Sequence, residues 1–306
     1  MGLGTYGSYV MVRDGPYARR RRVPAQGRAG RDVGGGAAAH RDGKGTAMTA
    51  SGRWALVTGA TGGLGEEFCR QLARDGWSLV LHGRDADRLM ALADELGRLG
   101  ADVRTVTADL AAANGADELV GKVDALGIEP ELLVNNAGFG YAAAFAESDA
   151  ARQRALLQVN VQAPTGLALA YSARMAARGS GAIVNVASVA GVMPGPYMAT
   201  YYASKAYVLS LSEALHEELA ERGVEVLAVC PGPVRTGFWS VAGTNTQGRN
   251  AFMLSAEEVV RIALVALARG RAVCAPGLVS KACYAFGRSM PGIVSRKVCA
   301  LFNRAK

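Results

Sequence analysis

Short apolar runs alternate with longer helix-like stretches along residues 53–277 of the chain. The seven runs begin at Trp54, Trp77, Val103, Glu131, Gly181, Val224 and Arg271. Each is nearly continuous in aliphatic and β-branched residues, which is typical of strands buried on both faces of a sheet. The stretches between them have helical spacing and span residues 64–75, 85–99, 114–126, 150–177, 200–222 and 255–268. The pattern therefore predicts seven strands separated by six helices.

Strand–helix alternation predicts an α/β fold. Successive right-handed βαβ crossovers build a single doubly wound parallel sheet of about seven strands, of the Rossmann type, with helices on both faces. In such sheets ligands bind beyond the carboxyl ends of the strands, where the strand order reverses. We place this domain at residues 51–275, after a leader at 1–50 and before a C-terminal extension at 276–306.

The formal charge of +8 is concentrated at the two ends of the chain. Residues 1–47 hold nine Lys or Arg and three Asp, and residues 269–306 hold eight Lys or Arg and no acid, so the body carries −6. A nucleic-acid-binding domain would place its cations on the folded body, so we expect no nucleic-acid partner. The Gly-, Ala- and Arg-rich leader is expected to be disordered, with Met48 as the natural start. A tail that binds nucleic acid or a phosphoprotein is the alternative.

The cysteines and the apolar runs indicate the compartment. Five cysteines without a CxxC pair indicate reduced thiols, and no run reaches the 18 apolar residues of a membrane span. We therefore expect a cytoplasmic protein.

The basic C-terminal extension adds a second possibility. Residues 293–304 predict a helix with an apolar face opposite a basic one; the apolar members are Ile293, Val294, Val298, Leu301 and Phe302, and the basic ones Arg296, Lys297 and Arg304. Such a helix is typical of peripheral membrane contact. The competing interpretation is a helix that closes a binding pocket or a dimer seam.

A glycine-rich loop follows the first strand and opens the first helix, in "TGATGGLG". Gly59, Gly63 and Gly65 allow a tight turn in which backbone N–H groups approach a pyrophosphate at the helix N-terminus. Turns also use glycine, but the placement between strand and helix favours a dinucleotide. The loop therefore predicts a nicotinamide dinucleotide as the cofactor.

The end of the second strand bears on the choice between NADP and NAD. Sites that prefer NAD usually carry an acid here, whereas this chain has His82, Gly83 and Arg84. Arg84 suits the 2′-phosphate of NADP, although Asp85 could instead face the ribose. We expect NADP to be preferred and NAD to be possible.

The stretch "YYASK" contains candidate acid–base chemistry. In a helix, Tyr201 and Tyr202 lie four and three residues before Lys205, so geometry alone leaves both tyrosines open. The lysine charge favours a neighbouring phenolate and is expected to lower a tyrosine pKa from about 10 towards 7. A phenol tuned in this way can exchange a proton with a carbonyl or alcohol oxygen.

Several motifs together resemble the short-chain dehydrogenase/reductase family: TGxxxGxG, "NNAG" at 135–138, Ser188 in "NVAS", and Tyr-x-x-x-Lys. The resemblance runs from about residue 53 to 270, and the tail resembles a bacterial subgroup with a basic C-terminal extension. It implies that Tyr201 is the general acid/base and that Ser188 holds the substrate oxygen. It further implies that Lys205 holds the nicotinamide ribose and that Asn160 anchors a water for proton relay.

The resemblance also implies a set of cofactor-binding residues and an assembly. The cofactor set is Gly59, Thr61, Gly63, Leu64, Gly65, Arg84, Asp109, Asn136, Ala137, Gly138, Tyr201, Lys205, Pro231, Gly232, Val234 and Thr236. Asn135 is implied to stabilise the sheet, and a helix N-cap is the alternative role for Asp109. The helices that carry Asn160 and Tyr201 commonly form a homodimer or homotetramer in this family.

The residues expected near the substrate are apolar. Phe238, Trp239, Phe252 and Met253 lie in an expected lid, and Phe139, Tyr141 and Phe145 lie near the same mouth. They indicate a hydrophobic carbonyl or alcohol, such as a 3-oxoacyl or ketosteroid-like substrate. The alternatives are a carrier-protein-dependent 3-oxoacyl reductase of fatty-acid synthesis and a non-catalytic NADP-sensing protein. His82 and His216 lack nucleophile or metal-ligand spacing, so we expect no metal site.

Overall fold

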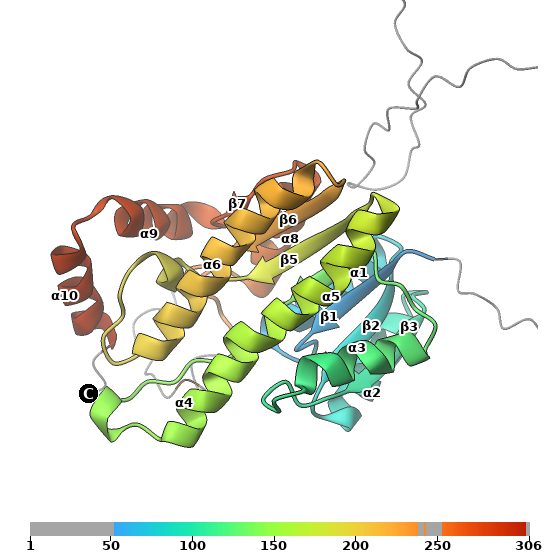
Figure 1. Cartoon of the computed structure of the whole chain (residues 1–306), viewed down its shortest axis with the longest axis horizontal. Coiled ribbons are helices and arrows are strands. Elements are labelled where there is room, and N and C mark those ends of the chain that lie inside the picture. Colours follow the sequence, from blue (N-terminus) through green and yellow to red (C-terminus); the bar gives the residue numbers. More distant parts are fainter. Residues whose placement is uncertain (1–51, 238–241, 243–252, 304–306) are drawn as a thin grey trace, which may run out of the picture. The chain divides into compact units, whose positions relative to one another are not determined.

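The computed structural model describes residues 52–237, 242 and 253–303. The described residues belong to one compact unit, Gly52–Lys306. Its centre is a single seven-stranded parallel sheet of order β3-β2-β1-β4-β5-β6-β7 (Figure 1). The strands are β1 (Trp54–Thr58), β2 (Ser78–Gly83), β3 (Val103–Thr107), β4 (Leu132–Asn135), β5 (Gly181–Val186), β6 (Val224–Val229) and β7 (Val273–Cys274). The predicted fold class and all seven predicted strands are confirmed.

The centre of the sheet is buried on both faces, as the continuous apolar runs predict. All five residues of β1 are buried, and Leu56 pairs in register with Val80 of β2 and Leu133 of β4. The chain runs outwards from β1 in both directions, so the strand order reverses between β1 and β4. The carboxyl ends of these two strands therefore form the switch point at which such folds bind ligands.

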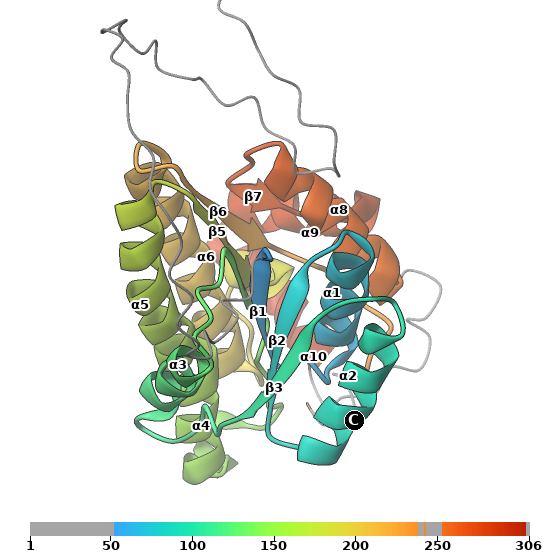
Figure 2. The same cartoon turned by 90° about the vertical axis from the view of Figure 1, so that its right-hand side faces the viewer.

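Helices cover both faces of the sheet (Figure 2). One face carries α1 (Gly63–Arg74), α2 (Ala86–Gly97) and α8 (Ala256–Ala268), and the other carries α3 (Gly115–Ala125), α5 (Ala163–Arg178) and α6 (Ala199–Ala220). The doubly wound arrangement is therefore confirmed. Among the described residues, no helix has both the length and the apolar character needed to cross a lipid bilayer.

The long helix predicted over 150–177 is interrupted. It consists of α4 (Ala150–Leu157), one π-helical turn at Gln158–Gln162, and α5. Pro164 stands in the first turn of α5 and has no backbone N–H, so it cannot donate to the carbonyl four residues before it. The loss of that bond favours the wider π turn. Asn160 lies in this turn and is almost completely buried.

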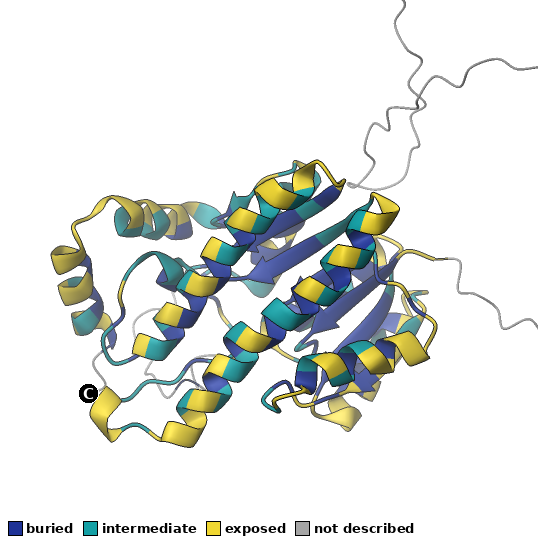
Figure 3. Cartoon of the chain, viewed as in Figure 1, coloured by how far each residue is buried: buried dark blue, intermediate teal, exposed yellow. Residues whose placement is uncertain are grey.

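Two helices follow the last strand: α9 (Gly277–Ser289), which the sequence pattern did not predict, and α10 (Gly292–Asn303), which it did. Their packing differs from an ordinary amphipathic helix. The buried residues of α10 are Ser295, Cys299 and Asn303, spaced by four, whereas Ile293 is 53% and Leu301 79% exposed (Figure 3). The helix therefore contacts the body through small and polar side chains and exposes bulky apolar ones.

Candidate active site

The glycine-rich loop lies at the switch point and is closely packed. Gly59 has φ +62°, a left-handed conformation that glycine adopts without steric cost. A Cβ at Gly65 would lie 2.1 Å from the carbonyl oxygen of Gly59, and one at Gly63 would lie 2.6 Å from Cγ2 of Thr236. A side chain at Gly65 would collide with the loop itself and one at Gly63 with Thr236, which explains the two glycines.

The "NNAG" segment supports the same loop. The Asn136 side chain donates to the carbonyl oxygens of Thr58 (2.9 Å) and Gly59 (3.0 Å). The backbone N–H groups of Asn136 and Ala137 both donate to Thr58 Oγ1, each at 3.0 Å, and that hydroxyl donates to the Val134 carbonyl at 3.2 Å. These hydrogen bonds therefore join the carboxyl ends of β1 and β4.

Asn135 has a different role. It is buried and donates to Asn185 Oδ1 at 2.9 Å, and Asn185 in turn donates to Ser212 Oγ. This chain connects β4, β5 and α6, which agrees with the expectation that Asn135 stabilises the sheet.

His82 contributes to the site, and the sequence analysis gave it no function. It is buried at the end of β2; its Nδ1 accepts from the Gly59 N–H at 3.4 Å, and its Nε2 lies 3.2 Å from the Ala108 carbonyl. Because Nδ1 accepts, the proton belongs on Nε2, which donates to Ala108. Burial lowers the pKa of His82 to about 4, so the ring is neutral at neutral pH. His82 thus helps to fix the left-handed turn at Gly59.

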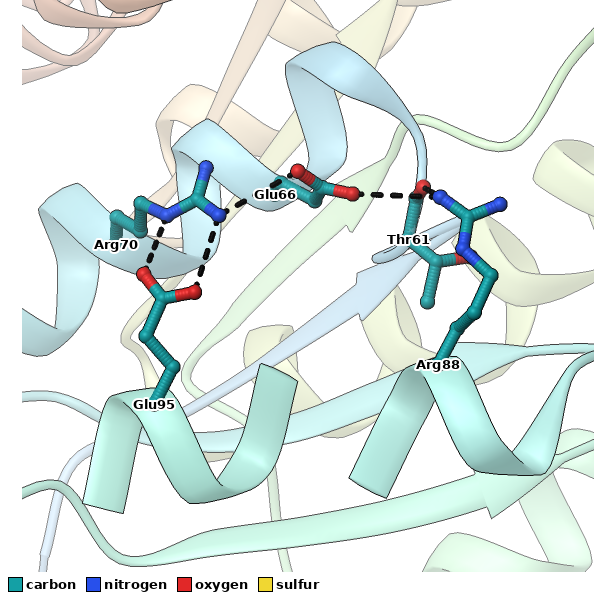
Figure 4. Close-up of polar contacts among 5 residues, drawn as sticks. All are labelled: Thr61, Glu66, Arg70, Arg88 and Glu95. Carbon is teal, nitrogen blue, oxygen red and sulfur yellow. Dashed lines mark hydrogen bonds and ion pairs between the residues drawn. The ribbon is translucent and has the colours of Figure 1, made fainter. Parts of the chain in front are cut away.

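A polar network borders the loop at the end of β2 (Figure 4). Arg88 of α2 donates to the Thr61 carbonyl at 2.5 Å and lies 3.4 Å from Glu66 of α1. Arg70 then bridges Glu66 and Glu95, so α1, α2 and the loop are connected.

The two candidates for the adenosine ribose are placed differently. Arg84 is exposed just after β2, and no hydrogen-bond partner for it occurs within the described part of the chain. Asp85 instead caps α2, because its carboxylate accepts from the Arg88 N–H at 3.1 Å. Asp85 is thus already used within the chain, whereas the Arg84 cation faces solvent.

The other residues expected to hold the cofactor each have contacts of their own. Asp109 is exposed, and its carboxylate accepts from the Ala111 N–H at 3.0 Å; because α3 begins only at Gly115, Asp109 is not its N-cap. A Cβ at Gly138 would lie 3.4 Å from Lys205 Nζ. On the opposite side the Pro231 carbonyl accepts from Ser188, the Gly232 N–H donates to Ser280 Oγ, and Val234 bridges to Leu254.

The two tyrosines that sequence geometry left open have different surroundings. Tyr201 is buried in an apolar cluster with Leu156, Ala190 and Met198. Its neighbour Tyr202 donates its hydroxyl to Asn303 of α10, 3.3 Å away. The chain therefore places Tyr201 beside Ser188 and directs Tyr202 towards the C-terminal helix.

Lys205 lies one turn of α6 after Tyr201, and Asn160 lies in the π turn between α4 and α5. Lys205 Nζ donates to the Val186 carbonyl at 2.7 Å and is 6.0 Å from the Tyr201 ring centroid. Burial lowers the pKa of Lys205 to about 8. Asn160 Nδ2 donates to the carbonyl oxygen of Phe139 and to Ser204 Oγ, and its Oδ1 accepts from the Phe139 N–H. Asn160 thus joins the π turn to α6 and to the loop after β4.

The pKa of Tyr201 differs from the expectation that Lys205 lowers it. Burial raises the pKa of the phenol well above its ordinary value, and a hydrogen bond with Ser188 opposes this rise only in part. Desolvation is the largest cause, because the charged phenolate is the form that burial disfavours. The chain's own residues therefore keep Tyr201 protonated.

Apolar side chains surround this phenol. Phe139 and Tyr141 pack against the Tyr201 cluster, which also contains Ala242, whereas Phe145 is exposed. Of the expected lid residues, Met253 is buried. Phe238, Trp239 and Phe252 lie outside the described residues.

Comparisons with known proteins agree with this geometry. The family model for short chain dehydrogenase matches residues 53–247. The chain belongs to the short-chain dehydrogenase family. This family is one of dehydrogenases, that is, of oxidoreductases.

Individual relatives match about three fifths of the chain. A very-long-chain 3-oxoacyl-CoA reductase of Podospora anserina is 36% identical over 200 residues, which is 63% of this chain and 58% of that protein. A galactitol 2-dehydrogenase of Cereibacter sphaeroides is 39% identical over 198 residues, 62% of this chain and 75% of the relative. Among solved structures, a short-chain dehydrogenase from Sphingobium yanoikuyae in complex with NADPH has TM-score 0.68 and 36% identity, covering 72% of this chain and 86% of that one.

The loop of this short-chain dehydrogenase fits a dinucleotide. The N-cap of α1 is Gly62, which has no side chain to cap the first backbone N–H groups of the helix. Uncapped N–H groups at a helix N-terminus favour an anionic phosphate. Because Gly63 and Gly65 have no side chains, nothing at these two positions obstructs a pyrophosphate on the loop backbone.

Proposed function

We propose that the protein is an NADP(H)-dependent oxidoreductase that interconverts a carbonyl and a secondary alcohol on a hydrophobic substrate, with Tyr201 as general acid/base. One observation carries the proposal: a protonated phenol lies in an apolar cluster, next to Ser188 and one helical turn from Lys205. A proton donor in apolar surroundings is what reduction of a hydrophobic carbonyl needs.

The chain's residues have separate tasks in the proposed reaction. The nicotinamide supplies the hydride when bound. Tyr201 gives its phenolic proton to the carbonyl oxygen as negative charge develops there, and Ser188 hydrogen-bonds the same oxygen. Lys205 stabilises the resulting phenolate, and Asn160 holds the turn through which a proton returns to Tyr201. The raised pKa of Tyr201 favours reduction, because the proton to be donated is present at neutral pH.

The preference for NADP over NAD is proposed on charge. Arg84 is exposed after β2 and the guanidinium of Arg88 lies at the Thr61 carbonyl, so two cations border the place proposed for the ribose 2′-phosphate. Asp85, the residue that would favour NAD, caps α2. The Sphingobium yanoikuyae structure contains NADPH, which supports the same preference.

The proposed substrate class is a bulky hydrophobic ketone or a 3-oxoacyl thioester. The apolar cluster around Tyr201 supports it, and so do the printed names of two similar proteins: the Podospora anserina reductase and a bulky-bulky ketone specific alcohol dehydrogenase from Comamonas testosteroni (32% identical, TM-score 0.66, covering 78% of this chain and 95% of that chain). A carrier-protein-dependent 3-oxoacyl reductase is the second candidate, favoured by the acid-free tail. A non-catalytic NADP sensor is disfavoured, because Ser188, Tyr201, Lys205 and Asn160 are all present.

Turnover across a set of carbonyls tests these proposals. Absorbance of the reduced cofactor would be followed with short ketones, bulky ketones, ketosteroids and long-chain 3-oxoacyl thioesters, each offered with NADPH and with NADH. We expect turnover to rise with apolar size and to be faster with NADPH. Faster turnover with NADH would contradict the role of Arg84, and preference for small polar sugars would contradict the substrate class.

We also propose a cytoplasmic protein whose partners are a second copy of itself and an anionic membrane surface. The exposed Leu169 of α5 and Tyr207 of α6 lie on the helices through which a homodimer or homotetramer would form. Leu301 is exposed on α10, which also carries Arg296 and Lys297, and supports the membrane contact.

One pair of variants separates the two contacts. Leu301→Ser should abolish co-sedimentation with vesicles of anionic lipid and leave the oligomer unchanged. Leu169→Ser should change the oligomer and leave co-sedimentation intact. The reverse pattern would exchange the two surfaces, and equal vesicle binding by Leu301→Ser and the unaltered protein would contradict the membrane contact.

A further inference from the structure

The C-terminal helices contact the body at the segments that surround the candidate site. Ser280 of α9 accepts from the Gly232 N–H at 2.9 Å, in the loop after β6. A Cβ at Gly287 would lie 2.4 Å from Cγ2 of Val192, so α9 packs closely against the turn that follows Ser188. The tail thus borders the chain on the Ser188 side of the site.

Asn303, at the end of α10, makes the contact that lies nearest to the candidate acid in the sequence. It is 8% exposed, and both atoms of its side-chain amide are used. Nδ2 donates to the Pro196 carbonyl at 3.1 Å, and Oδ1 accepts from the Tyr202 hydroxyl at 3.3 Å. Because a carbonyl can only accept and a phenol can donate, the pair of partners fixes which way the amide points. The buried face of α10 therefore ends, at Asn303, in two specific hydrogen bonds and not in an apolar contact.

The two partners of Asn303 stand on either side of a strained residue. Tyr197 has φ +67°, and it is the one non-glycine with positive φ in the described part of the chain. That conformation is costly for a residue with a bulky side chain and persists only when its surroundings impose it. From the other side, the Ala143 N–H donates to the Tyr197 carbonyl at 2.8 Å. The segment is thus held between the loop after β4 and Asn303.

We propose that Asn303 is a positioning residue for Tyr201: it fixes Pro196 to Tyr202 and so sets the start of the helix on which Tyr201 lies. This rests on the proposed function, in which Tyr201 donates the proton. Proton transfer depends steeply on the placement of the donor, so a small shift at the start of α6 lowers turnover. Neither partner of Asn303 belongs to the residues proposed to hold the cofactor. Loss of the contact is therefore expected to change catalysis and to spare cofactor binding.

Four variants of the full chain test the proposal, assayed with NADPH and the best carbonyl found for the unaltered protein. Asn303→Ala removes both bonds, and we expect kcat to fall about tenfold or more. Asn303→Asp keeps the acceptor for Tyr202 but loses the donor to Pro196, so its kcat should also fall. Tyr202→Phe removes one bond and should have the smaller effect. Leu278→Ser, at an exposed position of the neighbouring helix α9, is the control and should leave kcat unchanged.

Two further measurements distinguish positioning from general destabilisation. The dissociation constant for NADPH, measured by nucleotide fluorescence, should stay within about twofold in every variant, because neither partner of Asn303 is among the residues proposed to hold the cofactor. The double variant Tyr202→Phe/Asn303→Ala should be no slower than Asn303→Ala, because both changes remove the same bond. Hydrogen exchange at the Met198–Tyr202 amides should quicken in Asn303→Ala, and exchange in the middle of α6 should not.

The outcomes separate this proposal from the proposed function. Full kcat in Asn303→Ala, or an equal loss in Leu278→Ser, overturns the positioning role. A loss of NADPH affinity as large as the loss of kcat also overturns it. If the unaltered protein reduces none of the carbonyls with NADPH, the proposed function fails; quickened exchange at Met198–Tyr202 in Asn303→Ala would then still establish the contact, and unchanged exchange would refute it.

Discussion

Two residues of nearly equal backbone conformation lie on opposite sides of the candidate site. Gly59, in the cofactor loop, has φ +62°, and Tyr197, beside the candidate acid, has φ +67°. Glycine adopts this conformation freely, whereas tyrosine adopts it at a cost of order 1–3 kcal/mol. The cofactor side is thus relaxed at its turn, and the substrate side is strained at the equivalent turn.

The charges show the same difference. On the cofactor side the buried His82 is neutral, and its ring nitrogens lie in reach of Gly59 and Ala108. On the substrate side Lys205 is buried with one carbonyl as its described hydrogen-bond partner, and burial lowers its pKa to about 8. The comparison indicates that the destabilising features, the strained Tyr197 and the buried Lys205, lie where a proton is to be moved. The turn at Gly59, where the dinucleotide is to be held, is relaxed.

After Tyr201, the largest effect on turnover is expected at Lys205. Lys205→Met should lower turnover about a hundredfold or more, because the phenolate loses its stabilising charge. The same variant should be more stable at pH 7. Burial lowers the lysine pKa from 10.5 to about 8, which destabilises the folded unaltered protein by about 3 kcal/mol at 1.36 kcal/mol per unit. The variant is free of this cost but loses the hydrogen bond to Val186, worth about 1 kcal/mol. Its net gain in stability is therefore about 2 kcal/mol.

The pH dependence of that gain checks its origin. The unfolded lysine binds a proton up to about pH 10.5 and the folded one only up to about pH 8, so the unaltered protein gains stability as pH rises between these values. The advantage of Lys205→Met should therefore shrink over this range in denaturant titrations. A variant less stable than the unaltered protein at pH 7 would contradict the assigned cost.

The cofactor turn should be the least tolerant of added atoms. Gly59→Ala should lower the free energy of unfolding by about 3 kcal/mol and abolish NADPH binding, because a Cβ would lie 2.9 Å from the Ala137 Cα at positive φ. Gly121→Ala is the matched control: Gly121 lies inside α3 with no atom near its Cβ position. It should raise stability by about 0.5–1 kcal/mol. Equal effects of the two substitutions would remove the argument for a specific turn.

The stability of the protein should also depend on pH through His82, which lies on the cofactor side. Its folded pKa of about 4 lies below the ordinary value of 6.5, so the unfolded chain binds the proton first as pH falls. Stability should therefore fall by about 2 kcal/mol between pH 7 and pH 5, and this contribution should be absent in His82→Gln. Chemical unfolding at the two pH values measures it. An equal fall in both proteins would assign the dependence to other groups.

The smallest effect is expected at Tyr197. Tyr197→Gly relieves the strained conformation but makes the unfolded chain more flexible, so the two terms nearly cancel and stability should change by less than about 1 kcal/mol. Thermal unfolding of Tyr197→Gly and Gly59→Ala, measured under the same conditions, compares the two turns directly. A loss as large as that of Gly59→Ala would mean that Tyr197 is held by its side chain and is not strained.

How much could be predicted from the sequence follows from how local each interaction is. Each strand, and the glycine turn, depends on residues that lie close together in the sequence, within one βαβ unit. The continuous apolar runs indicate the strands, and the spacing of Gly59 and Gly65 indicates the turn. The π turn at Asn160 was not predicted, although Pro164 was available as an indication of a break. Helical geometry alone left Tyr201 and Tyr202 open, because both positions face Lys205, and the choice of Tyr201 came from the family resemblance.

The remaining features depend on distant contacts. His82 acts through Gly59 and Ala108, which directly follow β1 and β3, the strands on either side of β2. Asn303 reaches Pro196 and Tyr202 across more than a hundred residues of chain, and the pattern of α10 suggested an apolar contact face where the structure uses a polar one. No periodicity or motif indicates a pairing of that kind.

Turnover by Tyr201→Phe tests the central claim most directly. The variant and its matched control, Tyr202→Phe, would be assayed by NADPH absorbance with a bulky ketone and a long-chain 3-oxoacyl thioester, and NADPH affinity would be measured for both. We expect Tyr201→Phe to lose about a thousandfold in kcat with unchanged NADPH affinity, and Tyr202→Phe to retain most of its activity. If Tyr201→Phe turned over as fast as the unaltered protein, or Tyr202→Phe were the inactive one, Tyr201 would not be the proton donor.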